Sequence, residues 1–173
     1  TAGDPLPSLL GAFLGRDKMS ASGSMLSHSC FSSESIHAAV QALAAEEKIV
    51  EMDEWIFESA FWAQQLMLAE KAVDGFHRSH SELLGISPTE LRSHLDGRWS
   101  NGDGFGVLVR ELERNGFCSE GTVVRRTEHQ ISLPSDLEPS VKRLRLSLGE
   151  KLLEPPARKQ LIGSFLDERA IRY

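Results

Sequence analysis

The stretch FWAQQLMLAEKAVDGFHRSHSELLGISPTELRSHL, residues 61–95, decides how the chain is organised. Its first half carries apolar and aromatic side chains at intervals of three and four residues, which predicts one long amphipathic helix; the stripe consists of Trp62, Leu66, Ala69, Val73, Phe76 and His80. Gly75 lies inside this helix and costs roughly 1 kcal/mol relative to alanine, so we expect either a close backbone contact or a bend there. Ser87, Pro88 and Glu90 then have the spacing of an N-cap, a first helical residue and a capping box, which predicts a second, short helix.

Length and composition are typical of soluble globular protein. The chain has 173 residues, of which 40% are hydrophobic and 25% charged. No run approaches the roughly 20 apolar residues that span a bilayer, and the first residues lack the pattern of a secretion signal. The two cysteines, Cys30 and Cys118, are too few for a disulfide framework. We therefore expect a cytoplasmic protein with no membrane contact.

Charge is distributed unevenly along the chain. Residues 1–60 hold 3 Lys or Arg against 9 Asp or Glu, residues 61–133 hold 8 against 10, and residues 134–173 hold 8 against 6. Polyphosphate binding depends on local positive surface, so any nucleic-acid contact is expected in the C-terminal third.

The N-terminal part reads as three helices followed by a hairpin. Leucines between residues 6 and 14 predict the first helix, and Met25 to Phe31 predict a short, partly buried second one. Ser33 is expected to cap a third helix. The apolar period then changes to two, which predicts two short strands around residues 49–52 and 55–57.

The same order of elements follows a second time. The long helix and the short helix after Ser87 are followed by GFGVLVRELERNG, residues 104–116, and then by a hairpin that turns at Gly121 and continues towards Ile131 and Leu133. An offset of 69 residues places Leu43 on Leu112 and Trp55 on Val124. A third series begins after residue 134 and is incomplete at Tyr173.

Three helices followed by a two-stranded wing are the parts of a winged-helix domain. The predicted fold class is therefore α+β, mostly α, with tandem winged-helix units at residues 1–60, 61–133 and 134–173, the last of them incomplete. The long helix is expected to join the first two units rigidly, and LPSDLEP at residues 133–139 is the expected hinge.

Several blocks resemble the C-terminal extension of the bacterial selenocysteine-specific elongation factors. They are FHRSHSELLGISPTELRSHL, the helix ending RELERNGF, EGTVVRRTEHQISL, and LGEKLLEPPARKQL, and their shared order carries the resemblance from about Val50 to about Gln160. It implies tandem winged-helix domains that follow a core binding GTP and Mg²⁺. In the family, the last such domain grips the mRNA hairpin, and the earlier ones act as a spacer towards the GTPase and tRNA end.

For this chain the resemblance implies a non-catalytic spacer without a cofactor of its own. Its partners would be the ribosome, the selenocysteine-insertion mRNA hairpin and selenocysteinyl-tRNA, all reached through the whole factor, with this part of it monomeric. Two alternatives stay open, namely a winged-helix DNA-binding transcription regulator and a protein-binding scaffold. The regulator predicts a basic third helix, whereas the third helices here carry balanced or acidic charge.

Motifs for catalysis and metal binding are weak. No P-loop pattern occurs, and the glycine-rich run at residues 101–106 lacks a preceding apolar strand, so it is expected to be a loop in which Asp103 caps a helix. The residues His77, His80, His94 and Cys118 lack zinc-site spacing, so no metal site is expected. The pairs Ser27–His28 and Ser79–His80 are not expected to meet, because neighbours on a helix point apart, and no enzyme is expected.

Basic residues on the second wing and beyond it are the candidate RNA contacts, since wings and helix starts are where winged-helix proteins touch phosphates; the candidates are Arg125, Arg126, Lys142, Arg143, Arg145, Arg158 and Lys159. The alternative is an ordinary solvated face with local ion pairs. Trp55 and Trp62 are expected in the core, whereas Trp99, in a polar loop, is the candidate for stacking on a base.

Overall fold

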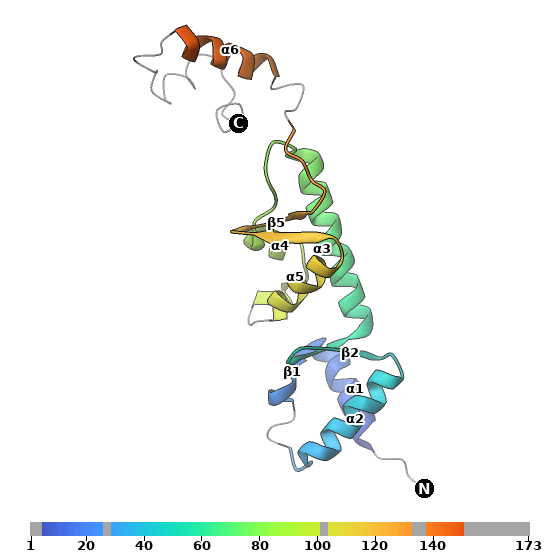
Figure 1. Cartoon of the computed structure of the whole chain (residues 1–173). Coiled ribbons are helices and arrows are strands. Elements are labelled where there is room, and N and C mark those ends of the chain that lie inside the picture. Colours follow the sequence, from blue (N-terminus) through green and yellow to red (C-terminus); the bar gives the residue numbers. More distant parts are fainter. Residues whose placement is uncertain (1–4, 26–28, 101–103, 133–137, 151–173) are drawn as a thin grey trace.

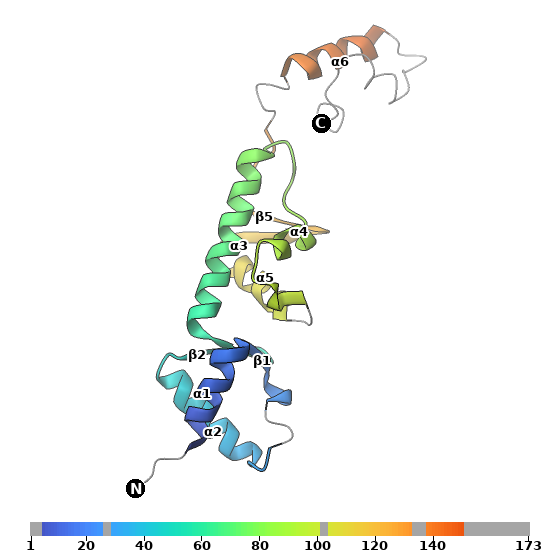
Figure 2. The ribbon, with the colours of Figure 1, turned by 180° about the vertical axis from the view of Figure 1, so that it is seen from behind.

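The computed structural model describes residues 5–25, 29–100, 104–132 and 138–150. The fold is mixed α+β and mostly helical, with two small antiparallel sheets, as the sequence predicted. A first group of elements, here called unit one (residues 5–58), lies at one end of the long helix α3, and the remaining elements up to residue 126 lie along its side (Figures 1 and 2). We call this second group, residues 59–126, unit two.

Unit one consists of two helices packed on a three-stranded sheet. Its elements are α1 (Pro5–Asp17), β1 (Met19–Ala21), the 3-10 helix η1 (Ser22–Ser24), α2 (Ser33–Ala45), β2 (Ile49–Met52) and β3 (Trp55–Glu58). The strand order is β1-β3-β2, all antiparallel. Every third or fourth residue of α1 faces α2 and the sheet, so its leucines at 6, 10 and 14 are buried together with Val40, Leu43 and Ile56.

Unit two repeats this order with an isolated bridge in place of the first strand. Its elements are α3 (Ser59–Ser79), α4 (Pro88–Ser93), the 3-10 helix η2 (Gly97–Ser100), α5 (Gly104–Arg114), β4 (Phe117–Glu120) and β5 (Val123–Arg126). Ile86 forms an isolated antiparallel bridge with Val124 of β5, at the place where β1 pairs with β3 in unit one. A further helix, α6 (Glu138–Glu150), follows.

Gly85 is required by this bridge. A Cβ atom at Gly85 would lie 2.5 Å from the carbonyl oxygen of Val124 and 2.9 Å from Cβ of Arg125. The backbone of the α3–α4 loop can therefore approach β5 only where there is no side chain.

The N-cap and the first helical residue predicted for the short helix after α3 are confirmed. Ser87 caps α4 by accepting a hydrogen bond from the amide of Glu90 (3.2 Å), and Pro88 is the first helical residue. The close backbone contact predicted at Gly75 is absent, because no atom outside its own stretch of helix lies within 4 Å of the position that its Cβ would occupy. The alternative, a bend in the helix there, stays a prediction.

Four local predictions are wrong. Residues 19–24 form strand β1 and a 3-10 turn, and the predicted helix over Met25–Phe31 is absent from its described residues, where Cys30 and Phe31 are exposed. Ser32, not Ser33, caps α2, since its Oγ accepts from the amide of Ser35 (3.1 Å). Ile131 lies outside any strand and is exposed.

The fourth error concerns the register of the repeat. The buried strand residues correspond at an offset of 68, with Ile56 matching Val124, whereas Leu43 and Leu112 match at the predicted 69. Trp55 therefore corresponds to Val123. Leu133, Asp103 and residues 133–137 of the expected hinge at 133–139 lie outside the described residues, whereas Glu138 and Pro139 begin α6. The domain boundaries at 60 and 133 stay predictions.

Candidate functional site: the joint between the units and the second wing

An aromatic cluster joins unit one to unit two. Phe57 of β3 contacts Trp62 of α3 with ring centroids 4.4 Å apart, and Trp99 of η2 lies 5.9 Å from Phe57 and 5.8 Å from Phe61. Phe105 of α5 meets Trp99 edge-on at 6.5 Å. All five rings are at most 5% exposed. We call this set of five residues the aromatic joint.

The position of Trp99 corrects the prediction that it is available for base stacking. Its side chain is 1% exposed, and its indole Nε1 donates a hydrogen bond to Oε1 of Gln65 on α3 (3.0 Å). The same oxygen accepts from the backbone amide of Asp96 (3.1 Å). Trp62 is buried and Trp55 half-buried, as predicted.

Gln65 is the residue that pattern reading missed. It is 1% exposed, although glutamine usually lies at the surface. The signal is present in the sequence, because Gln65 lies three residues after Trp62 and four before Ala69 and therefore belongs to the buried face of α3. A polar residue in such a position needs an internal hydrogen-bond partner.

The hairpin of unit one also contacts α5. Asp53, at the turn of the hairpin, accepts hydrogen bonds from Nε (3.2 Å) and Nη2 (2.5 Å) of Arg110. Beside them the Trp55 ring lies against Gly104, where a Cβ would stand 3.4 Å from Cε3 of the indole. The hairpin of unit one therefore contacts unit two through Asp53 and Trp55. In a winged-helix protein that reads DNA, the third helix, here α5, would instead need its basic side chains free for bases.

The two arginines of the second wing are paired within the protein. Arg126 donates to both carboxylate oxygens of Asp74 on α3 (2.6 and 2.8 Å), and its guanidinium lies 4.3 Å from the Phe117 ring centroid. Arg125 pairs with Glu120 across the hairpin (3.0 Å). The hydrogen bond from Arg126 lowers the pKa of Asp74, and in return the bond to Asp74 raises the pKa of Arg126. Much of the positive charge predicted for RNA is therefore neutralised locally.

The remaining basic candidates lie on α6 or outside the described residues. Lys142, Arg143 and Arg145 are exposed, and none of the three forms an ion pair with another described residue. Arg158 and Lys159 fall outside the described residues. Of the five candidates within the described residues, only those on α6 present side chains in the way that phosphate binding requires.

The histidines are arranged differently from a zinc site. His77 stacks on His129 with ring centroids 3.7 Å apart and planes 1° from parallel. Burial is the main cause that lowers the pKa of His77, followed by the proximity of His129. Within the described ranges no group of three or more potential ligands is placed to hold a metal ion.

Ser79 and His80 do meet, contrary to prediction. Ser79 Oγ lies 2.9 Å from Nδ1 of His80, because His80 is the C-cap of α3 (φ −136°, ψ 58°) and its ring is no longer directed by helical geometry. The hydroxyl also donates to the carbonyl oxygens of Gly75 (3.0 Å) and Phe76 (3.2 Å). This pattern is that of a helix-end hydroxyl. The pair Ser27–His28 lies outside the described residues.

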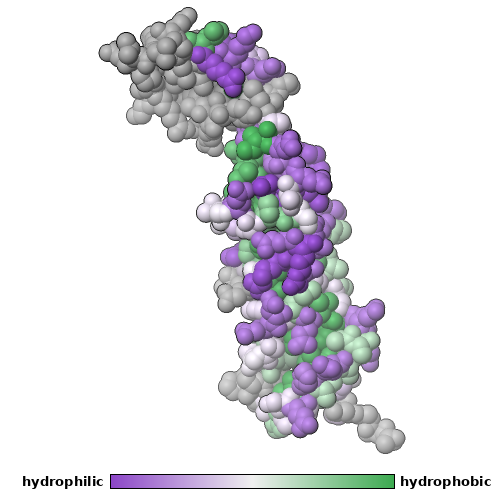
Figure 3. Space-filling view, in the orientation of Figure 1, coloured by the Kyte–Doolittle hydropathy of each residue, from purple (hydrophilic) through white to green (hydrophobic). Residues whose placement is uncertain are grey.

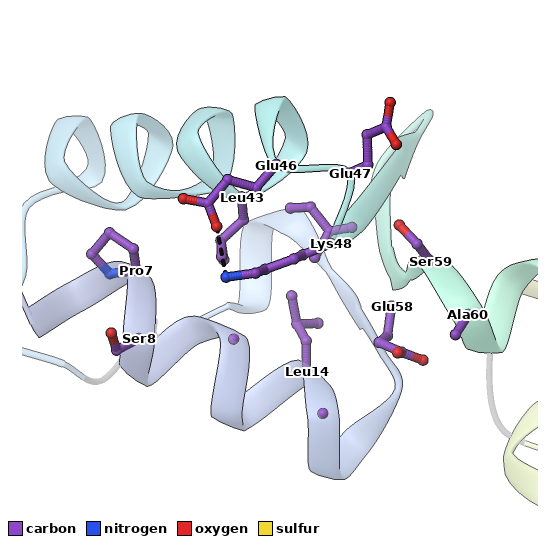
Figure 4. Close-up of a pocket in the computed structure, with 13 residues that line it drawn as sticks. Pro7, Ser8, Leu14, Leu43, Glu46, Glu47, Lys48, Glu58, Ser59 and Ala60 are labelled. Carbon is purple, nitrogen blue, oxygen red and sulfur yellow. Dashed lines mark ion pairs between the residues drawn. The ribbon is translucent and has the colours of Figure 1, made fainter.

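A hollow of about 620 Å³ opens in unit one between α1, the end of α2 and the start of α3 (Figure 4). Three of its four charged lining residues are already engaged. Lys48 pairs with Glu46 (2.6 Å), whereas Glu58 caps α3 by accepting from the amide of Phe61 (2.8 Å).

Hydrophilic residues cover most of the middle of the molecule on the face drawn in Figure 3, with smaller hydrophobic areas among them. No helix in the described ranges is both long and apolar enough to cross a membrane. No protein-family model and no curated protein matches the sequence.

Proposed function

We propose that the chain is a stiff, non-catalytic arm of tandem winged-helix units, of the kind that spaces the GTPase and tRNA-binding core of a selenocysteine-specific elongation factor from the mRNA hairpin. The winged-helix part is supported by the repeated order of helix, first strand or bridge, short helix, helix and hairpin. In both units the segment after the first helix pairs with the last strand, through β1 and β3 or through Ile86 and Val124. The assignment to translation rests on the sequence resemblance.

The observation that carries the arm function is the aromatic joint. Each large apolar side chain that becomes exposed costs about 1.5–3 kcal/mol, so separating the units enough to expose two rings costs on the order of 3–6 kcal/mol. Fewer than about 1% of molecules would then be open at any time. The contacts of Asp53 with Arg110 and of Trp55 with Gly104 add to this cost. Such a joint transmits orientation along the arm, which a spacer requires.

The competing function is DNA binding through the third helix and the wing of each unit. It is less well supported, because Arg110 of α5 is paired with Asp53 and Arg114 with Glu111 (3.0 Å). The wing arginines Arg125 and Arg126 are also paired with carboxylates. A specific reader needs such side chains to be available to bases or phosphates.

Fluorescence anisotropy with a selenocysteine-type mRNA hairpin and a DNA duplex of equal charge separates these functions. At about 50 and 200 mM salt the arm should bind both ligands weakly and without preference, because phosphate-led binding falls steeply over this range. Tight, hairpin-selective binding would overturn the spacer function. A preference for DNA would instead favour the transcription regulator.

A further inference from the structure

The segment that follows β5, residues 127–132, lies against the C-terminal end of α3 and the loop after it. The amide of Ser132 donates to the carbonyl oxygen of Ser81 (2.9 Å), and Ser81 Oγ donates back to the carbonyl oxygen of Ser132 (3.3 Å). His129 Nε2 lies 3.0 Å from the carbonyl oxygen of Leu83. Residues 127–132 form no strand. The start of the segment is tied to the second wing, since the amide of Thr127 donates to the carbonyl oxygen of Gly116 (3.0 Å) and Arg125 Nη1 donates to that of Thr127 (3.3 Å). Its contacts with α3 and the loop after it are the bonds of Ser132 and His129 and one ring stack.

The ring stack involves His77 of α3 and His129 of this segment. His77 Nε2 is buried and has no hydrogen-bond partner in the structure, so a proton there would lack an acceptor. The two rings are parallel with centroids 3.7 Å apart, so positive charges on both rings would repel each other at close range.

Most of the nearby charges disfavour a protonated His77. Asp74 on the same helix is its nearest compensating group, but that carboxylate already accepts two hydrogen bonds from Arg126. Arg125 and Arg126 on β5 both act against a positive charge at His77. The loop after α3 adds one buried carboxyl group, Glu82, which is 8% exposed.

We infer that His77 and His129 form a proton-sensitive latch, in which the ring stack holds residues 127–132 against α3 while the His77 ring is neutral and releases them when that ring becomes protonated. The sign follows from linkage. The pKa of His77 is lowered from 6.5 while it is stacked, so the released form binds a proton more readily. The latch is therefore complete above about pH 6.5 and weakens as the pH falls towards the lowered value.

Residues 127–132 lead from unit two towards α6, so the latch would control the direction of the chain after unit two. This role for the latch rests on the proposed arm function. With the latch closed, the direction in which the chain leaves unit two is fixed. With it open, the chain beyond the second wing can reorient while the aromatic joint stays intact. The latch itself is measured without RNA, so its failure and that of the spacer function are distinguishable.

Amide hydrogen exchange on the whole chain, read residue by residue by NMR between pH 7.5 and 5.5, tests the latch. The protection factor of the Ser132 amide should fall at least about fivefold at the lower pH. The Val124 amide, which donates to the carbonyl oxygen of Ile86 (2.8 Å), should keep its protection and so show that unit two remains folded. Unchanged protection at Ser132, or an equal loss at Val124, would overturn the inference.

Substitution separates the histidines from other titrating groups. His77→Phe keeps an aromatic ring for stacking but cannot be protonated, so protection at Ser132 should no longer depend on pH. His77→Leu, which likewise cannot be protonated, serves if His77→Phe does not fold. His37→Phe, at an exposed position of α2, is the matched control and should keep the wild-type dependence. A wild-type pH dependence in the folded His77 variant would show that His77 is not the sensor.

Discussion

Replacing Gln65 by leucine should weaken the aromatic joint more than any surface change on α3. The substitution removes the acceptor of the buried Trp99 indole N–H and of the Asp96 amide. A buried donor that loses its acceptor costs about 1–3 kcal/mol. The Asp96 amide is only partly buried, so the loss of its acceptor should cost less. The leucine side chain recovers part of the free energy by burying apolar surface. We expect a net loss of roughly 2–3 kcal/mol in the free energy of unfolding.

Urea unfolding followed by tryptophan fluorescence measures this loss, since Trp62 and Trp99 lie within the joint. With an m value of about 2 kcal/mol per molar, the midpoint should fall by roughly 1–1.5 M. Gln64→Leu is the matched control, because Gln64 is the exposed neighbour of Gln65 on the same helix and should leave the midpoint nearly unchanged. If the urea midpoints of Gln65→Leu and Gln64→Leu differ by less than about 0.3 M, the hydrogen bonds to Gln65 do not stabilise the joint as argued.

Two backbone positions give further predictions. Gly85→Ala should lower the free energy of unfolding by about 1–3 kcal/mol, because its Cβ would stand 2.5 Å from the Val124 carbonyl oxygen. Gly97→Ala is the control and should be close to neutral, because no neighbouring atom lies within 4 Å of the position of its Cβ. Equal urea midpoints for the two variants would contradict the close approach. Glu47→Gly should raise the free energy of unfolding by about 0.5–1 kcal/mol, because Glu47 has φ 57° in the left-handed region that glycine adopts more easily. Glu46→Gly, at φ −85°, is the control and should not stabilise the protein. Thermal unfolding that ranks the two variants in the opposite order would refute this reason.

The sequence was sufficient where one periodicity continued over several turns or strands. The stripe through Trp62, Ala69 and Val73 predicted α3, and the cap at Ser87 predicted α4. Both signals are local, because a helix buries one face and leaves its first amides to a cap. Positive φ at Gly116 and Gly121 likewise agrees with the predicted helix stop and hairpin turn.

The sequence was insufficient where the partner is distant in the chain. Trp99 lies in a polar context, and its burial depends on distant partners, namely Gln65, 34 residues earlier, and the rings of Phe57 and Phe61. Strand β1 has three residues, too few for an alternating pattern, and exists because β3 offers it an edge. The pairing of Arg126 with Asp74 spans 52 residues, so the wing arginines could not be recognised as neutralised from their neighbours in sequence.

The stiffness of the joint is the central claim, and ¹⁵N relaxation on the whole chain tests it most directly. Amides of unit one, residues 5–58, and of unit two, residues 59–126, should fit a single elongated diffusion tensor with one overall correlation time, because the aromatic joint opens too rarely to decouple them. Separate and shorter correlation times for the two units would contradict the account. They would mean that the buried rings of the joint do not hold the units in one orientation.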